Sequence, residues 1–270
     1  MRPRLILLAT AALAAVAVFP GLARAASGDA QSSNWAGYAI ADDATVNGAP
    51  ITGSTTALSF SSVTATWVQP KVTCGSDGPS YSAFWVGLGG FATDSAALEQ
   101  TGTSADCSAS GKASYSAWYE LVPAATVTVK LKIMPRDVIT ASVNVLPTGV
   151  LVQIKDRTRK TAFTKLLATP TAVDATSAEW IAEAPSTCDA LLTRCRALPL
   201  ANFGSVPFTR IAAVANGHGG TITDPMWSST AIDLVPDSAS ARFGNLGSTG
   251  SATPGAVDPT GRAFAVAFAA

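Results

Sequence analysis

The sequence predicts an all-β fold, and three observations lead to that prediction. Short segments rich in valine, isoleucine, threonine and aromatic residues recur along the chain, separated by glycine and proline. Two of them, 125–133 and 137–146, alternate apolar and polar residues with the period of a strand that has one wet face. No convincing helical period appears after residue 26. We therefore predict one β domain, a sandwich or a barrel.

The predicted strands are separated by turn signals along the whole chain. Pro70, Gly89-Gly90, Pro123 and Pro185 each end one strand. The segments 41–54 and 237–260 are rich in glycine, proline and small polar residues, so we expect loops there. Residues 156–159 are expected to form the turn of a hairpin. The strands are expected at 34–38, 56–69, 82–88, 96–101, 115–122, 125–133, 137–146, 150–155, 160–167, 178–184, 198–203, 208–215, 230–234 and 263–269.

The N-terminus has the pattern of an export signal. Met1-Arg-Pro-Arg4 is positively charged, an apolar run covers residues 5–19, and small residues follow at 23–26. This order predicts a signal peptide over residues 1–26 and a secreted single domain over residues 27–270. The alternative is an uncleaved membrane anchor, which needs about 20 apolar residues. The run here is shorter and ends at Pro20-Gly21.

The charge balance gives no sign of a nucleic-acid partner. The chain has 18 basic and 18 acidic residues, and charged residues make up only 13 % of it. Without Arg2, Arg4 and Arg24 of the signal, 15 basic residues face 18 acidic ones, a net charge of −3. A basic footprint for nucleic acid is therefore not expected. We expect a monomer, with no membrane contact once the signal is removed.

The cysteines of an exported chain are expected to be paired. The chain has four of them, which predicts two disulfides. We predict the pairs Cys74–Cys107 and Cys188–Cys195, because the second closes a short local loop. A metal site is the alternative, but there is a single histidine and no C-x-x-C motif.

That single histidine, His218, restricts the catalytic chemistry of the chain. It lies in the glycine-rich stretch 216–220, with no nucleophile motif nearby, so Ser-His and Cys-His arrangements are not indicated. The sequence contains neither G-x-S-x-G nor H-E-x-x-H, and no aspartic-peptidase signature. Carboxylates and amides on strands remain as candidates.

Two of these carboxylates lie in one predicted strand. Glu179 and Glu183 are four residues apart, so both point to the same face. Paired carboxylates suggest glycoside hydrolysis. Positions four apart are separated by about 13 Å at Cα, however, and a single strand does not place them on opposite sides of a sugar bond. The plain alternative is that both are solvated. Gln100, considered alone, would be taken as a structural amide.

Six short motifs in a fixed order change this interpretation. They are Asn34-Trp-Ala-Gly37, Phe84-Trp-Val-Gly87, Leu98-Glu-Gln-Thr-Gly102, Ala117-Trp-Tyr-Glu120, Ala178-Glu-Trp-Ile-Ala-Glu183 and Phe203-Gly-Ser-Val206. Their order and approximate spacing resemble the glutamic peptidases, or eqolisins, along nearly the whole mature chain. The short loop between Cys188 and Cys195 resembles one in that family too. The likeness is to a secreted member of the bacterial type.

The resemblance implies a fold, an activity and a catalytic pair. The fold is a β-sandwich of two bent antiparallel seven-stranded sheets, of concanavalin or jelly-roll type. The activity is that of an acid-acting secreted endopeptidase on polypeptide substrates, with no metal or organic cofactor. The catalytic glutamine of the family falls on Gln100. The catalytic glutamate falls on Glu183 and not on Glu179.

The chemistry of such a pair is coherent. Glu183 would take a proton from water and return it to the leaving amine, while the Gln100 amide would stabilise the oxyanion. A glutamate with an ordinary pKa of about 4.3 stays partly ionised in mild acid. The resemblance also implies that Trp85 and Trp118 line the substrate groove, with Glu120 as a polar support. Plain core packing is the alternative for both tryptophans.

The sequence also departs from the family pattern, and a rival function stays open. Gly89 and Ser116 stand where family members often carry aspartate, and Leu121 and Val122 where aromatic residues are common. We expect these changes to alter the working pH and the specificity. The rival is a carbohydrate-binding sandwich module without catalysis, in which Gln100 and Glu183 would be far apart or buried.

Overall fold

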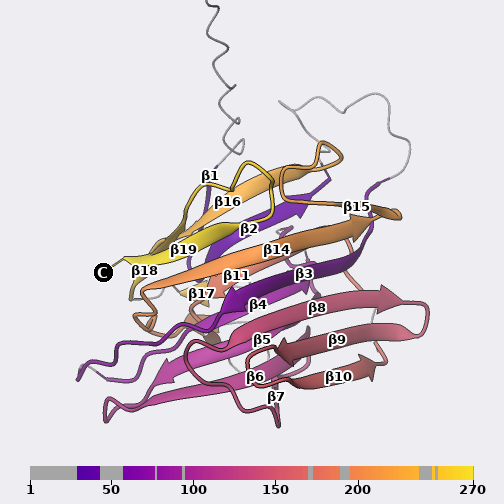
Figure 1. Ribbon diagram of the computed structural model, residues 1–270. Coiled ribbons are helices and arrows are strands. Elements are labelled where there is room, and N and C mark those ends of the chain that lie inside the picture. Colours follow the sequence, from indigo (N-terminus) through magenta and orange to yellow (C-terminus); the bar gives the residue numbers. More distant parts are fainter. Residues whose placement is uncertain are drawn as a thin grey trace, which may run out of the picture.

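The described part of the chain is all-β, as predicted. The computed structural model describes residues 29–42, 57–76, 78–92, 95–169, 173–188, 195–236, 245–246 and 249–269. Within these ranges there is no α-helix, and long strands run side by side across the molecule (Figure 1). The predicted signal peptide, residues 1–26, lies outside the described residues.

Most predicted strands are present, with shifted ends. The strands are β1 (Asp29–Ser32), β2 (Trp35–Ala41), β3 (Phe60–Val68), β4 (Ala83–Leu88), β5 (Leu98–Cys107), β6 (Ala113–Val122), β7 (Val127–Val129), β8 (Val138–Leu146), β9 (Gly149–Asp156), β10 (Thr161–Leu167), β11 (Ser177–Glu183), β12 (Ser186–Cys188), β13 (Cys195–Ala197), β14 (Ser205–Ala215), β15 (His218–Gly220), β16 (Ser228–Leu234), β17 (Asn245–Leu246), β18 (Ser251–Pro254) and β19 (Phe264–Ala269).

Hydrogen bonds join the long strands into one continuous path. Its order is β10-β9-β8-β3-β14-β19-β18-β16-β2-β11-β4-β5-β6-β7. We call β10 to β14 the outer arm, β16 to β7 the site arm, and β18 and β19 the joining strands. The join is narrow, since β18 pairs with β16 only through Leu234 and Ala252. Strand pairing therefore links what the resemblance implied to be two separate sheets.

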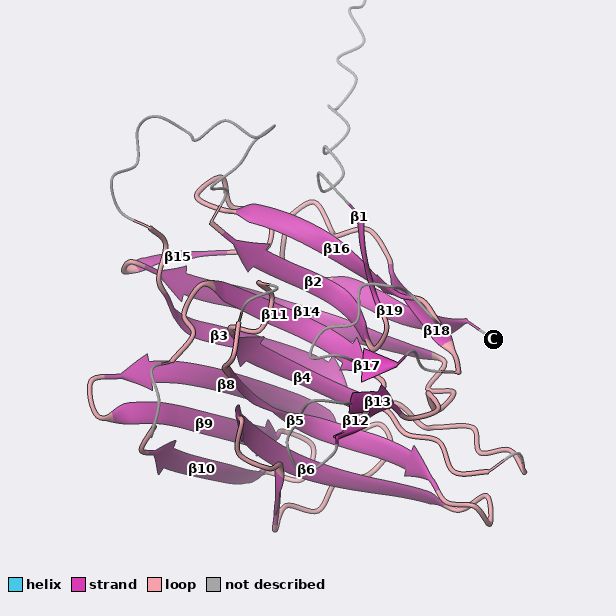
Figure 2. Cartoon of the chain, turned by 180° about the vertical axis from the view of Figure 1, so that it is seen from behind, coloured by secondary structure: helices cyan, strands magenta, loops and turns pink. Residues whose placement is uncertain are grey.

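A small second sheet accompanies this path. It consists of β12, β13 and β17, and Figure 2 shows it in front of the long strands when the molecule is viewed from behind. β12 and β13 are joined by the Cys188–Cys195 disulfide.

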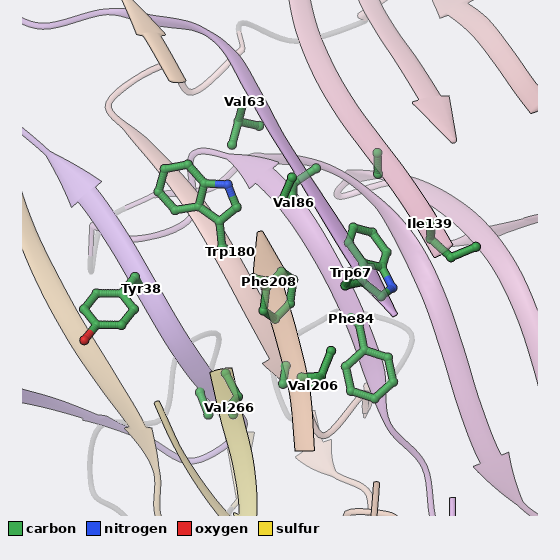
Figure 3. Close-up of a cluster of buried hydrophobic side chains, with 14 of the residues drawn as sticks. Tyr38, Val63, Trp67, Phe84, Val86, Ile139, Trp180, Val206, Phe208 and Val266 are labelled. Carbon is green, nitrogen blue, oxygen red and sulfur yellow. The ribbon is translucent and has the colours of Figure 1, made fainter. Parts of the chain in front are cut away.

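The main core lies between the two arms, which pack face to face. Figure 3 shows Phe84, Val86 and Trp180 of the site arm among Trp67 and other side chains of the outer arm. Two indole groups also bond across the gap. Trp180 Nε1 donates to the Thr64 carbonyl at 2.9 Å, and Trp67 Nε1 donates to Thr103 Oγ1 at 3.0 Å. Buried indole N–H groups need such acceptors, and these bonds fix the register between the arms.

Three predicted elements differ in the structure. The segment 125–133 has the clearest alternation in the sequence, yet only Val127–Val129 forms a strand. Residues 198–203 form isolated bridges instead of a strand. The expected surface loop 237–260 contains β18, which completes the join between the arms, and β17. Part of that loop, 237–244 and 247–248, lies outside the described residues.

Candidate active site

A cavity on the site arm is lined by residues from distant parts of the sequence. Its volume is about 640 Å³, and Gln100 of β5, Glu120 of β6 and Glu183 at the end of β11 all line it. Strand order and alternation explain this convergence. Gln100 pairs with Glu120 of β6 and Gly87 of β4, while Glu183 pairs with Ala83, four residues along β4 and on the same face. The sheet therefore presents an amide and two carboxyls to one space, here called the site cavity.

The Gln100 side chain is held by a carboxyl group of the neighbouring strand. It is only 4 % exposed, and its Nε2 donates to Glu120 Oε2 at 2.7 Å. Glu120 is itself held by the Thr126 hydroxyl, which donates to Oε1 at 2.6 Å. Gln100 Oε1 is buried and has no hydrogen-bond partner among the described residues. Because a primary amide has two N–H groups, one of them stays available to a ligand.

The Glu183 carboxyl accepts hydrogen bonds from Asn34 and Trp85, and the Trp35 side chain is a further hydrogen-bonding neighbour. Asn34 Nδ2 donates to Oε1 at 3.0 Å, and Trp85 Nε1 donates to Oε2 at 2.7 Å. The Asn34 amide is oriented in turn, because the Ser32 hydroxyl donates to its Oδ1 at 3.2 Å. The carboxyl is thus fixed at the end of β11 by groups on two other segments.

Burial dominates the electrostatics of Glu183. Removal from water, followed by the negative charge of Glu120, raises the pKa of Glu183 to about 8. The N–H donors of Trp85, Trp35 and Asn34 favour the ionised form and oppose this shift. Burial likewise raises the pKa of Glu120, against hydrogen bonds from Thr126 and Gln100. Carboxyl groups with strongly shifted pKa values in a cavity are typical of functional sites.

The comparisons with known proteins decide the family. A model described as the Peptidase A4 family matches residues 33–241. The chain belongs to the Peptidase A4 family. It is a glutamic peptidase, in agreement with the six motifs of the sequence. A search of curated proteins gives no significant match.

Solved glutamic peptidases share its fold. Scytalido-glutamic peptidase with a transition state analog inhibitor aligns with a TM-score of 0.65 and 21 % identity, over 88 % of this chain and 98 % of that one. SCP-B, a member of the eqolisin family in a complex with the tripeptide Ala-Ile-His, gives 0.60 and 21 % over the same shares. Aspergilloglutamic peptidase from Aspergillus niger gives 0.54 and 24 %, over 70 % and 99 %.

The tryptophans of the peptidase differ from the prediction in one respect. Trp118 lines the site cavity, but Trp85 has no exposed surface and does not line it. Its ring packs edge-on against Trp35, with centroids 5.0 Å apart, and only its N–H reaches Glu183. Trp85 is therefore a donor beneath the carboxyl and not a wall of the groove. Trp35 lines the cavity in its place.

The two carboxyls of β11 have separate environments. They share a face of the strand, as predicted, but Glu183 lines the site cavity and Glu179 has no exposed surface and does not line it. A glycosidase pair needs both carboxyls at one substrate bond. The arrangement gives no support to that alternative.

A distant aspartate fills the space beside Gly89. This glycine has φ +81°, and a Cβ there would lie 2.6 Å from both Cβ and the carbonyl oxygen of Asp174. The Asp174 carboxylate accepts hydrogen bonds from Ser95, Thr176 and the Gly90 backbone N–H. These donors lower the pKa of Asp174 against the opposing effect of its burial. The missing aspartate at position 89 thus reflects a backbone that excludes any side chain.

Sequence reasoning missed several residues around the site. Asn34 appeared only as part of a motif, although its amide holds Glu183. Thr126 and Asp106 were not singled out, yet both line the site cavity. The alternation of β5 could have identified Asp106, because it shares a face with Gln100. Nothing local in the sequence predicts the placement of Asp174.

The structure contains both predicted disulfides. Cys74 pairs with Cys107, and Cys188 pairs with Cys195. The second disulfide lines the site cavity. In the described ranges there is no cluster of three or more residues suited to a metal. No helix of the same residues could span a membrane.

Proposed function

We propose that this glutamic peptidase is a secreted endopeptidase, active from mild acid upward, whose catalytic pair is Gln100 and Glu183. The observation that carries the proposal is their shared cavity, in which each side chain has its own hydrogen-bonded support. A polypeptide substrate is supported by the peptide and inhibitor complexes of proteins with the same fold. The carbohydrate-binding alternative expected the two side chains to be far apart or buried. Gln100 is indeed only 4 % exposed, but both side chains line one cavity, which does not favour that alternative.

In the proposed mechanism, Glu183 first accepts a proton from water and later donates it to the leaving amine. Its carboxylate takes a proton from a water molecule, whose oxygen attacks the scissile carbonyl carbon. The carbonyl oxygen becomes an oxyanion and is stabilised by the Gln100 N–H that does not bond to Glu120. Collapse of the tetrahedral intermediate breaks the C–N bond, and protonated Glu183 gives its proton to the leaving amine.

The environment of Glu183 sets the working pH. Only the ionised carboxyl accepts a proton from water, and burial with Glu120 raises the pKa of Glu183 to about 8. The acid limb of the pH profile therefore lies above the one expected for an ordinary glutamate with a pKa of about 4.3. The N–H donors of Asn34 and Trp85 keep the ionised form accessible. We propose activity that begins in mild acid and increases toward neutral pH.

The test is digestion of a denatured protein by the purified enzyme from pH 2 to 8. Mass spectrometry of the fragments distinguishes internal cleavage from trimming of the ends. Glu183→Gln is expected to lower kcat/KM by about 10²–10⁴-fold, because the amide cannot accept the proton. Asp233→Asn, on β16, is the control for a carboxyl-to-amide change outside the cavity. Full activity of Glu183→Gln would refute the proposed pair.

We further propose export as a mature monomer of residues 27–270, after removal of the signal peptide 1–26 and without later membrane contact. Two disulfides support an oxidising compartment. The face-to-face arms support a β-sandwich of two bent sheets, bridged by β18 and β19. The bacterial type of the enzyme is part of the same proposal. N-terminal sequencing and the native mass of the exported protein test the cleavage site and the monomer.

A further inference from the structure

One acidic side chain of the site cavity has no part in the mechanism above. Asp106 lines the cavity and lies on the same face of β5 as Gln100 and Ser104. Strand register places it relative to Glu183, which pairs with Ala83, which in turn pairs with Ser104. Asp106 is two residues beyond Ser104, about 7 Å further along the strand. It therefore lies within a few substrate residues of the scissile bond.

The Asp106 carboxyl is open to a ligand. Its Oδ1 accepts one hydrogen bond, from the Ser82 backbone N–H at 3.3 Å, and no other described residue donates to the group. Its neighbours are short. Ser114 lies opposite it on β6, and Ser104 pairs with Ser116. Serines in these positions leave room above the carboxyl for a long side chain.

The side chains that line the cavity carry negative charge, which favours a cationic ligand. Its described lining contains Asp106, Glu120 and Glu183 but no lysine, arginine or histidine. Gln100 and Thr126 engage Glu120, while Asn34 and Trp85 engage Glu183. Among the described residues, the Asp106 carboxyl has only the single backbone donor.

We propose that Asp106 forms a subsite for an arginine or lysine side chain of the polypeptide substrate. A guanidinium group pairs with a carboxylate through charge-assisted hydrogen bonds, and an ammonium group does so as a point charge. The inference rests on the proposed endopeptidase function and adds a substrate preference to it.

The preference should depend on pH. Burial raises the pKa of Asp106 to about 6, and the Ser82 N–H opposes this shift. The residues that face Asp106 and its neighbours, Ser114, Ser116 and Ser82, carry no charge. The other carboxyl groups in the described lining of the cavity are those of Glu120 and Glu183. Below about pH 6 the empty subsite becomes neutral and attracts a cation less strongly.

Pairs of quenched fluorescent peptides test this subsite. Each pair carries arginine or citrulline, its uncharged counterpart, at one position from P4 to P4′ of the cleavage site. The readout is the arginine-to-citrulline ratio of kcat/KM at pH 5 and pH 7. At one position we expect a ratio on the order of 10–100 at pH 7, and a smaller one at pH 5. Asp106→Asn should bring it close to 1, whereas Asp106→Glu and the control Asp233→Asn should retain it.

The outcomes separate the subsite from the proposed function. A wild-type ratio near 1 at every position, with citrulline peptides still cleaved and that cleavage lost in Glu183→Gln, overturns the subsite alone. A preference that persists in Asp106→Asn overturns it as well. Absence of cleavage of every peptide overturns the proposed function and the subsite together. Urea unfolding of each variant confirms that a folded enzyme is compared.

Discussion

The two arms of the sheet follow the same alternation but use their second face differently. In the outer arm, β8 and β9 bury every other residue against the core, and the opposite face is partly exposed. In the site arm, β4 is buried at every residue and β11 at every residue but Glu183. A polar group on the outer arm can bond to water. A buried one on β4, β5 or β11 of the site arm must find a protein partner or a ligand. Gln100 bonds to Glu120, and Glu183 bonds to Asn34 and Trp85.

Two glutamines give the sharpest test of this difference. Gln100 lies in the site arm, and Gln153 lies on β9 of the outer arm, where its Nε2 donates to Thr164 at 2.9 Å. Gln100→Ala is expected to lower kcat about 10²–10³-fold, because it removes an oxyanion donor. Gln153→Ala should leave kcat unchanged. Equal kcat values for the two variants would break the comparison.

Substitution of two glycines tests whether the two arms differ in how much a side chain added there lowers the free energy of unfolding. Gly89 follows β4, and an added Cβ would meet the Asp174 backbone. Gly217 follows β14, and no atom of the described residues lies within 4 Å of an added Cβ there. Both have positive φ, +81° and +80°. Gly89→Ala should lower the free energy of unfolding by roughly 2–4 kcal/mol, and Gly217→Ala by about 1–2 kcal/mol. Urea unfolding measures both, and a smaller loss for Gly89→Ala would contradict the packing argument.

Opposite shifts of the pH profile test the electrostatics of the site arm. Glu120→Gln removes a negative charge that raises the pKa of Glu183, so the acid limb of kcat/KM should move to lower pH. Asn34→Ala removes a donor that favours the ionised form, so the limb should move to higher pH. The glutamine in the first variant keeps an acceptor for Gln100. Shifts in the same direction would show that another group controls the limb.

The smallest effect is expected in the outer-arm core. Ile139 of β8 is fully buried between the arms, far in the sheet order from the catalytic pair. Ile139→Val should lower the free energy of unfolding by about 1 kcal/mol while kcat/KM is unchanged. Leu166→Ala, at an exposed position of β10, serves as the control with less than about 0.5 kcal/mol lost. A fall in kcat/KM would show that the arms are coupled.

Local pattern predicted most strands, because alternation and turn residues act over a few positions. It failed where pairing depends on a distant partner. Residues 129–133 alternate in burial as the pattern requires, but only the first of them belongs to a paired strand. β18 was expected to be loop because its composition is polar, although it bridges β16 and β19.

The site shows the same limit. The motifs identified Gln100 and Glu183, which the structure places in one cavity. They did not reveal that Trp85 is buried below the carboxyl, or that Asp174 fills the space at Gly89. Both facts depend on contacts between segments that only the folded chain brings together.

The narrow join between the arms has a consequence for biogenesis. β18 and β19 come from the C-terminal end of the described chain, yet they occupy the middle of the strand order. Until residues 251–269 emerge, β14 and β16 each have an edge whose backbone N–H and C=O groups lack their final partners. Such open edges invite pairing with other chains. A polypeptide truncated before this point is therefore expected to be prone to aggregation, because the arms cannot be joined without the C-terminal strands.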